Sequence, residues 1–164
     1  MERTLVWTLV VGLGATACVD LWALARRRLF GTPQPNYGFV GRWFAHLVRG
    51  RFRHDSIAAA SPVPHEALIG WMAHYVLGVA FAGLLVASYG VGWLQRPTLG
   101  PALAVGIATV AAPMLILQPG MGAGIAARRT PRPNAARLQS LVNHAAFGAG
   151  LYVAGWLARA LLVP

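Results

Sequence analysis

The sequence predicts an all-α integral membrane protein with four transmembrane helices, and three observations lead to this fold class. Of its 164 residues, 57% are hydrophobic and only 11% are charged, whereas soluble domains carry about 25% charged residues. Four apolar segments have the length of roughly 20 residues that a spanning helix needs. The fourteen basic residues are all arginine, and most of them lie in two of the connecting loops.

The four predicted helices cover residues 5–25, 67–89, 99–118 and 138–163. They leave a long loop at 26–66, a turn at 90–98 and a second loop at 119–137. With four crossings the two loops share a side, and together they hold eleven of the fourteen arginines. Because arginine-rich loops stay in the cytoplasm, both loops are expected inside and both termini outside. The whole chain is thus expected to form a single transmembrane domain.

The charge of the chain indicates which partners it can bind, and its cysteine content indicates whether it can form a disulfide. The formal net charge is +10, but no DNA-binding pattern accompanies the arginines, so we expect no nucleic-acid partner. Anionic lipid headgroups are the expected partner of the arginine-rich loops. Cys18 is the only cysteine, so no intrachain disulfide is expected. The run before Cys18 loosely resembles a lipoprotein signal, but the apolar segment continues past it to the arginines.

The long loop is expected to contain an amphipathic helix from Tyr37 to Arg53 that lies at the cytoplasmic membrane interface. Its apolar residues form one stripe, whereas Arg42, His46, Arg49 and Arg53 recur at helical spacing on another face. Two interpretations of the basic face stay open. It either adheres to anionic headgroups or forms a basic wall that binds an anionic ligand.

Each predicted helix places one polar side chain near the cytoplasmic boundary, namely Asp20, His74, Gln118 and His144. At a rise of about 1.5 Å per residue, the two histidines and Asp20 lie roughly 7–10 Å inside that boundary. Ionisable groups at this depth tend to face the interior of a helix bundle. This polar layer is either a set of interhelical hydrogen bonds or a site that binds a ligand or handles protons. Pro113 is expected to interrupt the third helix nearby.

The long loop also contains two pairs in which a histidine is followed directly by a carboxylate residue, His54-Asp55 and His65-Glu66. Glu66 is as well suited to stabilising the start of the second helix as to taking part in chemistry. His54, His74 and His144 are the candidates for metal ligands. No spacing among the histidines matches a zinc signature, so we assign neither a metal nor a cofactor.

Two further patterns have alternative interpretations. The motif TPQPN at residues 32–36 recurs as TPRPN at residues 130–134. This is either the trace of a duplicated helical hairpin or a coincidence in a chain rich in proline, arginine and alanine. The glycine-rich segment 120–124 follows the third helix. It forms either a nest of backbone N–H groups for an anion or a frayed helix end.

Several short motifs occur together in this chain. They are Gly41-Arg42-Trp43, the segment RFRHDSI at 51–57, Gly70-Trp71 with His74-Tyr75, Gln118-Pro119, His144, and GAGLY at 148–152. In combination they resemble a bacterial family of small membrane proteins catalogued as domain of unknown function 2938. The resemblance runs from Gly12 to Tyr152. It implies a multi-pass protein of the bacterial inner membrane with no assigned activity, and it supplies no catalytic residues.

We therefore expect a small inner-membrane protein that binds or transports a small substrate, which can be anionic, on the cytoplasmic side. The expected site residues are Asp20, Arg42, His46, Arg49, His54, Asp55, Glu66, His74, Gln118 and His144. One alternative is a His/carboxylate membrane enzyme, with or without a metal. Another is a structural partner in a larger membrane complex. A homodimer is compatible with transport, because four helices make a small transporter.

Overall fold

The computed structural model describes residues 2–162, and within this range the chain is helical and has no β-strand. The all-α prediction is therefore confirmed. The helices, in chain order, are α1 (Glu2–Phe30), α2 (Tyr37–Val48), α3 (Glu66–Tyr89), α4 (Gly92–Gln95), α5 (Leu99–Ala108), a π-helical turn η1 (Pro113–Leu117), α6 (Gln118–Gly120), a 3-10 turn η2 (Ile125–Ala127) and α7 (Pro133–Leu162).

Among the described residues, three helices are long and apolar enough to cross a membrane, namely α1, α3 and the helical run Leu99–Gly120. They correspond to the first three predicted spans. The fourth predicted span, 138–163, falls within α7 except for Val163, which lies outside the described residues. Its crossing of a membrane stays a prediction.

The chain divides into two compact units that alternate along the sequence. Unit 1 comprises the residues up to 34, residues 75–109 and the residues from 143 onward. Unit 2 comprises residues 35–74 and 110–142. Most residues of the two predicted arginine-rich loops, 26–66 and 119–137, belong to unit 2. The candidate site is therefore built within unit 2, and the bundle of long helices within unit 1.

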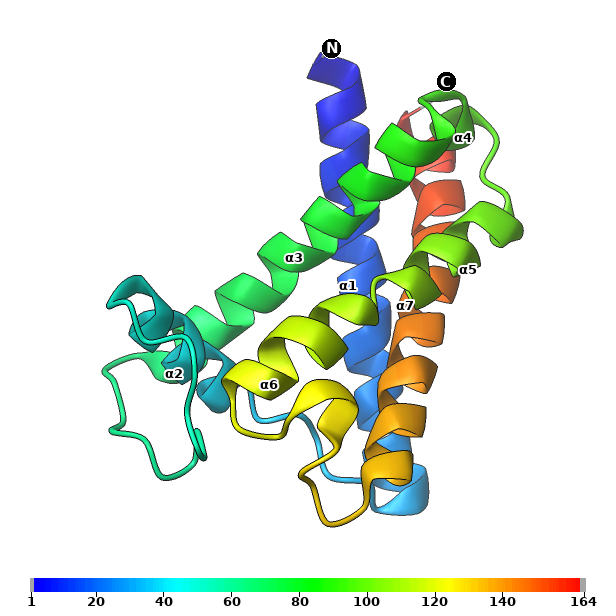
Figure 1. Cartoon of the computed structure of the whole chain (residues 1–164). Coiled ribbons are helices and arrows are strands. Elements are labelled where there is room, and N and C mark those ends of the chain that lie inside the picture. The colour runs from blue at the N-terminus through cyan, green and yellow to red at the C-terminus, as the bar shows by residue number, and fades with distance from the viewer. Residues whose placement is uncertain (1, 163–164) are drawn as a thin grey trace. The chain divides into compact units, whose positions relative to one another are not determined.

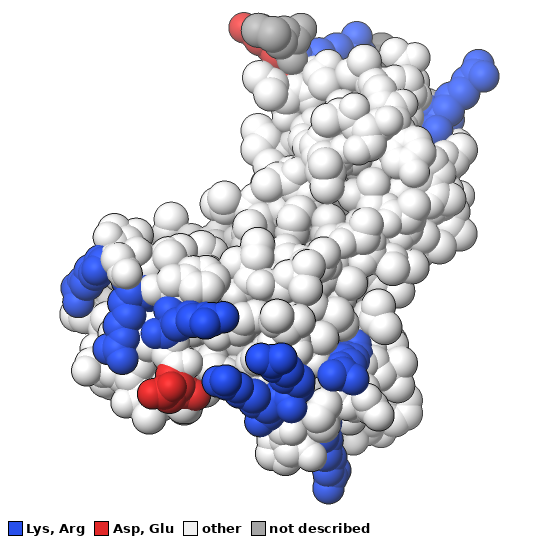
Figure 2. All heavy atoms as spheres, in the orientation of Figure 1, with Lys and Arg blue, Asp and Glu red and all other residues white. Residues whose placement is uncertain are grey.

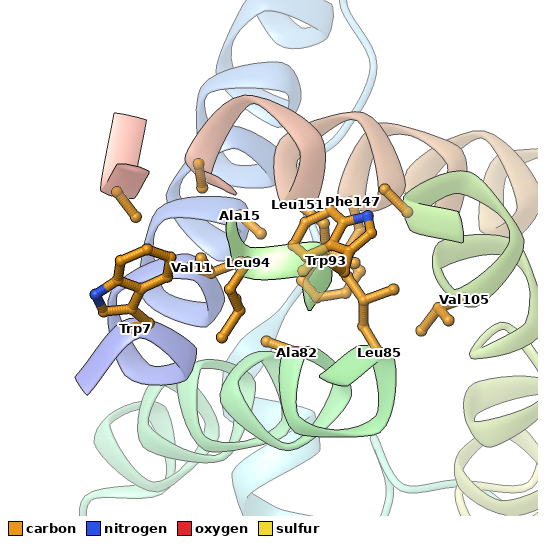
Figure 3. Close-up of a cluster of buried hydrophobic side chains, with 13 residues drawn as sticks. Trp7, Val11, Ala15, Ala82, Leu85, Trp93, Leu94, Val105, Phe147 and Leu151 are labelled. Atoms are coloured by element: carbon orange, nitrogen blue, oxygen red, sulfur yellow. The ribbon is translucent and has the colours of Figure 1, made fainter. Parts of the chain in front are cut away.

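The core of unit 1 lies where α1, the second half of α3, α5 and α7 meet (Figure 1). Figure 3 shows Trp93 of α4 beside Leu151 and Phe147 of α7, with Leu85 of α3 close by. Leu85 and Leu151 are fully buried. Both belong to one cluster of buried apolar side chains, and for helices in a bilayer the van der Waals packing of such side chains helps to hold them together.

Unit 2 begins with α2, and both ends of this helix have a local cause. Asn36 precedes it, and its side-chain Oδ1 accepts a hydrogen bond from the Gly38 N–H at 3.0 Å. Such a cap satisfies a backbone donor that has no partner within the helix. The helix ends at Val48, because Gly50 adopts a left-handed φ of +80° and turns the chain. The predicted extension to Arg53 is therefore wrong.

The third apolar segment is interrupted where the proline predicts. The regular helix α5 ends at Ala108, and the π-helical turn η1 starts at Pro113. Proline has no backbone N–H to donate, so a regular α-helical ladder cannot continue through it. The Gln118 N–H instead donates to the Pro113 carbonyl, which closes the wider turn.

Candidate anion-binding site

Arg42 ties α2 to the segment that leads into α3. Its guanidinium meets the Glu66 carboxylate at two points, since Nε–Oε2 and Nη2–Oε1 both measure 2.8 Å. The Arg42 Nη1 also donates to the carbonyls of Ile57, Ala58 and Ala60 at 3.0–3.3 Å. The hydrogen bond to Glu66 raises the pKa of Arg42 further above its ordinary value. Arg42 is buried, and the N–H donors of its guanidinium bond to groups of the protein itself.

His46 and Trp43 of α2 hold the loop that follows the helix. The His46 Nε2 lies 3.0 Å from the Ser61 carbonyl oxygen. The Trp43 Nε1–H donates to the Phe52 carbonyl at 2.9 Å. The indole of Trp43 also lies directly against Gly120, where a side-chain carbon would clash with it. The loop and the end of α6 are therefore both held against α2.

His54 joins this loop to α6. Its backbone N–H donates to the Gly120 carbonyl at 2.9 Å, and the Ile57 N–H donates to the Met121 carbonyl at 3.0 Å. The His54 Nδ1 lies 3.3 Å from the same Gly120 oxygen, a bond that requires the proton on Nδ1 because a carbonyl only accepts. The Nε2 of His54 is buried and has no hydrogen-bond partner among the described residues.

A pocket of about 340 Å³ lies beside His54, between the loop after α2 and the segment after α6. On the face drawn in Figure 2, basic side chains gather around an acidic one. We name the pocket beside His54 the arginine pocket. Its lining residues are Arg51, Arg53, His54, Asp55, Pro119, Gly124, Ile125, Arg128 and Arg129.

The charge of the arginine pocket suits an anion. Four arginines and one aspartate give an excess of three positive charges when His54 is neutral. None of the four arginines forms an ion pair with another residue in the described range 2–162. Guanidinium groups present paired N–H donors that match the oxygen spacing of carboxylates and phosphates. The geometry can thus hold a small anion with several oxygens.

The glycine-rich segment shapes one wall of the pocket. Gly122 has a left-handed φ of +97° and lies so close to the Asp55 carbonyl that a side-chain carbon would clash with it. Beyond it, the Arg129 N–H donates to the Ala123 carbonyl at 2.8 Å. The segment 120–124 is therefore an ordered turn, not a frayed helix end.

Two of the four predicted inner-layer residues lie in unit 1. The Tyr75 Oη–H donates to Asp20 Oδ2 at 2.8 Å, which joins α3 to α1. The His144 Nδ1 lies 3.0 Å from the Thr109 hydroxyl and 3.2 Å from the Gly106 carbonyl oxygen. Both residues thus make hydrogen bonds between helical segments of the same unit.

The other two inner-layer residues lie in unit 2. The His74 Nε2 lies 3.1 Å from the Tyr37 hydroxyl, and the two ring centroids are 4.5 Å apart with the rings tilted by 36°. The Gln118 amide donates to the Ser140 hydroxyl at 3.3 Å, which joins α6 to α7. Within each unit these residues join helices, as the hydrogen-bond interpretation expects. Convergence of all four into one layer stays a prediction.

The remaining predicted site residues have simpler environments. Arg49 is exposed directly after α2. Glu66 caps the entry to α3 as well as pairing with Arg42, because its Oε2 accepts from the Val63 N–H at 3.2 Å. Within residues 2–162, no three His, Cys, Asp or Glu side chains come close enough together to hold a metal ion.

Comparison with known proteins places the chain in a family. A family model described as "Protein of unknown function (DUF2938)" matches residues 9–158. The chain belongs to DUF2938. No curated protein and no solved structure matches it. The resemblance identified from the motifs is thereby confirmed.

The arginine pocket of this DUF2938 protein contains residues that sequence reasoning did not select. Of the predicted site residues, His54 and Asp55 line it, and so does Arg53 of the predicted basic face, whereas Arg51, Arg128 and Arg129 were not singled out. The signal that points to them is the predicted placement of both arginine-rich loops on one side of the membrane. Helical periodicity selected Arg53 from a helix that in fact ends at Val48, and it cannot find the other three, because none of them lies within a regular α-helix.

Proposed function

We propose that this DUF2938 protein is a multi-pass protein of the bacterial inner membrane that binds a small anionic substrate in the arginine pocket and transports it. The observation that carries the proposal is the convergence of Arg51, Arg53, Arg128 and Arg129 around His54. Like charges close together repel one another unless an anion lies between them. A pocket of about 340 Å³ is within the size range of small-molecule sites.

The membrane placement is supported by composition and by helix length. Three helices in the described chain are apolar and long enough to span a bilayer, and α7 is 30 residues long. With α7 as the fourth span, the pocket-lining loops share one side of the membrane. Their arginines favour the cytoplasm, so the substrate would be bound from the cytoplasmic side and both termini would lie outside.

In this proposal, α2 acts as the support of the pocket and lies at the membrane interface. Its buried Arg42, Trp43 and His46 hold the loop that carries Arg51 to Asp55. Exposed apolar side chains, such as Val48 at the end of α2, suit contact with lipid. Asp20, His74 and His144 would handle protons or polar groups of the substrate at membrane depth.

Binding is tested by calorimetric titration of the detergent-purified chain with inorganic phosphate and with pyrophosphate. The variant Arg128→Gln/Arg129→Gln removes two charges from the pocket. The variant Arg27→Gln/Arg28→Gln is a matched control, since it removes two consecutive, exposed arginines that do not line the pocket. We expect saturable binding that weakens about tenfold or more in the pocket variant and is unchanged in the control.

Three results would separate this proposal from its alternatives. Equal weakening in both double variants would show nonspecific charge attraction and overturn the pocket as a site. No binding of either anion would leave a structural partner in a membrane complex as the better interpretation. Chemical conversion of pyrophosphate by purified protein would favour the membrane enzyme instead.

Uptake is tested separately with proteoliposomes that contain the full chain. Anion flux that depends on Arg128 and Arg129 would support transport. Intact binding without any flux would restrict the proposal to a binding protein.

A further inference from the structure

A second pocket, formed only by residues of unit 1, also gathers arginines. It encloses about 550 Å³ where the first turns of α1, the α4 segment and the last turns of α7 come together. Figure 1 shows the first turns of α1 and the last turns of α7 at the same end of unit 1 as α4. Arg3, Arg96 and Arg159 line it, and no acidic residue of the described chain does. Its charge therefore favours an anion.

Trp7 supplies a polar group within this pocket. The side chain is 94% buried, at 6% exposure, yet its Nε1 has no hydrogen-bond partner among the described residues. Figure 3 shows the indole nitrogen on the side of the ring that faces away from Val11 and Leu94 of the core. A buried N–H without an acceptor costs folding free energy. An oxygen atom of a bound molecule would supply that acceptor.

The walls of the pocket indicate that the ligand has an apolar part. Val91, Leu94 and the ring of Trp7 line it together with the arginines. The flanking turns of α1 and α7 also expose large apolar side chains, with Leu5 60% and Leu161 79% exposed. A free inorganic anion would use the charges and leave these apolar surfaces uncovered. An amphiphile with an acidic head would use both.

We propose that this pocket binds the phosphate of an acidic phospholipid. The phosphate would lie between Arg96 and Arg159 and accept a hydrogen bond from the Trp7 N–H. The acyl chains would cover the exposed leucines of α1 and α7. Arginine and tryptophan together are the residues that membrane proteins place at the headgroup level. The inference is independent of substrate binding in the arginine pocket, because the two pockets share no residue.

The test is native mass spectrometry of the detergent-purified full chain with phosphatidylglycerol and with phosphatidylcholine of the same acyl chains. Glycerol 3-phosphate serves as the free-anion probe. We expect phosphatidylglycerol to bind about tenfold more tightly than phosphatidylcholine, and glycerol 3-phosphate to bind more weakly than either lipid. The variant Trp7→Phe, which keeps the buried ring and removes the donor, should weaken phosphatidylglycerol binding by roughly threefold or more.

Matched controls separate this site from general lipid contact. Trp22 also has a buried Nε1 without a partner in the described residues, but it lies outside the pocket, so Trp22→Phe should leave binding unchanged. Arg96→Gln/Arg159→Gln should weaken binding about tenfold, whereas the exposed pair Arg49→Gln/Arg132→Gln should not.

Equal binding of the two lipids, or equal binding by all variants, would overturn the proposal. Glycerol 3-phosphate binding as tightly as phosphatidylglycerol would show a free-anion site and overturn the lipid assignment.

Discussion

Arg42 and Glu66 meet edge to edge, with two N–O distances of 2.8 Å across the start of α3. The ion pair joins α2 to the first residue of α3, and the loop 49–65 connects the two helices along the chain. Because Arg42 also binds three carbonyls of that loop, it fixes the loop from within. The loop that carries half of the pocket arginines is therefore positioned by a buried arginine that lies outside the pocket lining.

Replacing Arg42 by lysine should destabilise unit 2 while leaving its charge unchanged. Lysine carries one ammonium on a flexible stem and cannot reproduce the two-point contact with Glu66 together with the carbonyl bonds. We expect the melting temperature of the detergent-purified chain to fall by roughly 5 °C or more. The exposed Arg49 of the same segment is the control, since Arg49→Lys should change the melting temperature little. Equal effects of the two changes would contradict the role assigned to Arg42.

Replacing Gly41 or Gly70 by alanine should prevent α2 from packing on the start of α3. A side-chain carbon at Gly41 would overlap the Glu66 carbonyl, and one at Gly70 would overlap the Tyr37 carbonyl. Backbone atoms cannot move aside as a flexible side chain can, so we expect loss of folded protein or a large drop in melting temperature. Gly100→Ala is the control, because Gly100 lies in α5 with open space around it. There the change should be neutral or stabilise by about 0.5–1 kcal/mol.

Replacing His54 by asparagine should separate the structural role of this residue from its role in binding. The asparagine amide can donate to the Gly120 carbonyl as Nδ1 does. It puts nothing at the position of Nε2, which donates to an anion only when both ring nitrogens carry a proton. We expect the melting temperature to stay within about 3 °C of the unchanged protein and pyrophosphate binding to weaken by roughly threefold or more. If calorimetry shows unchanged affinity, Nε2 takes no part in holding the anion.

Replacing Thr109 by valine should weaken the contact of α7 with the end of α5. The buried Thr109 hydroxyl bonds to His144 and to the Gly106 carbonyl, and valine keeps its shape but removes both bonds. We expect a loss of about 1 kcal/mol in unfolding free energy, measured by denaturation in detergent. Thr8 is the control, since within the described residues its hydroxyl bonds to the Thr4 carbonyl of the same helix, and Thr8→Val should cost less.

Hydropathy predicts the long helices of this chain well but not all of their ends. The apolar run predicted at 67–89 agrees with α3 within one residue, because Gly90, with a left-handed φ of +81°, stops the helix there. The run predicted at 5–25 is shorter than α1, which continues to Phe30 through three arginines. Apolar length reports the thickness of a membrane, whereas arginine is itself a good helix former. A helix can therefore extend beyond the end of its apolar segment.

The arginine pocket could be predicted only in part. Periodicity places Arg42 and His46 on a polar face of α2, but it cannot show that the loop 57–61 covers this face and buries both side chains. The pocket itself depends on the Gly120 carbonyl accepting from His54, a bond between residues 66 positions apart. No local pattern specifies such a pairing, so the arginines of the two loops could be placed on one side but not around one hollow.

The backbone bonds of His54 and Ile57 to Gly120 and Met121 also set an order for the making of this protein. A ribosome releases the chain from its N-terminus, so the loop after α2 emerges well before its partners are synthesised. Until Gly120 has been added and its helix placed, the loop has no α6 to pair with, and Arg51 and Arg53 face water alone. Maturation of the pocket is therefore a late event in biogenesis, and a chain truncated before residue 118 should insert its first helices without ever acquiring affinity for an anion.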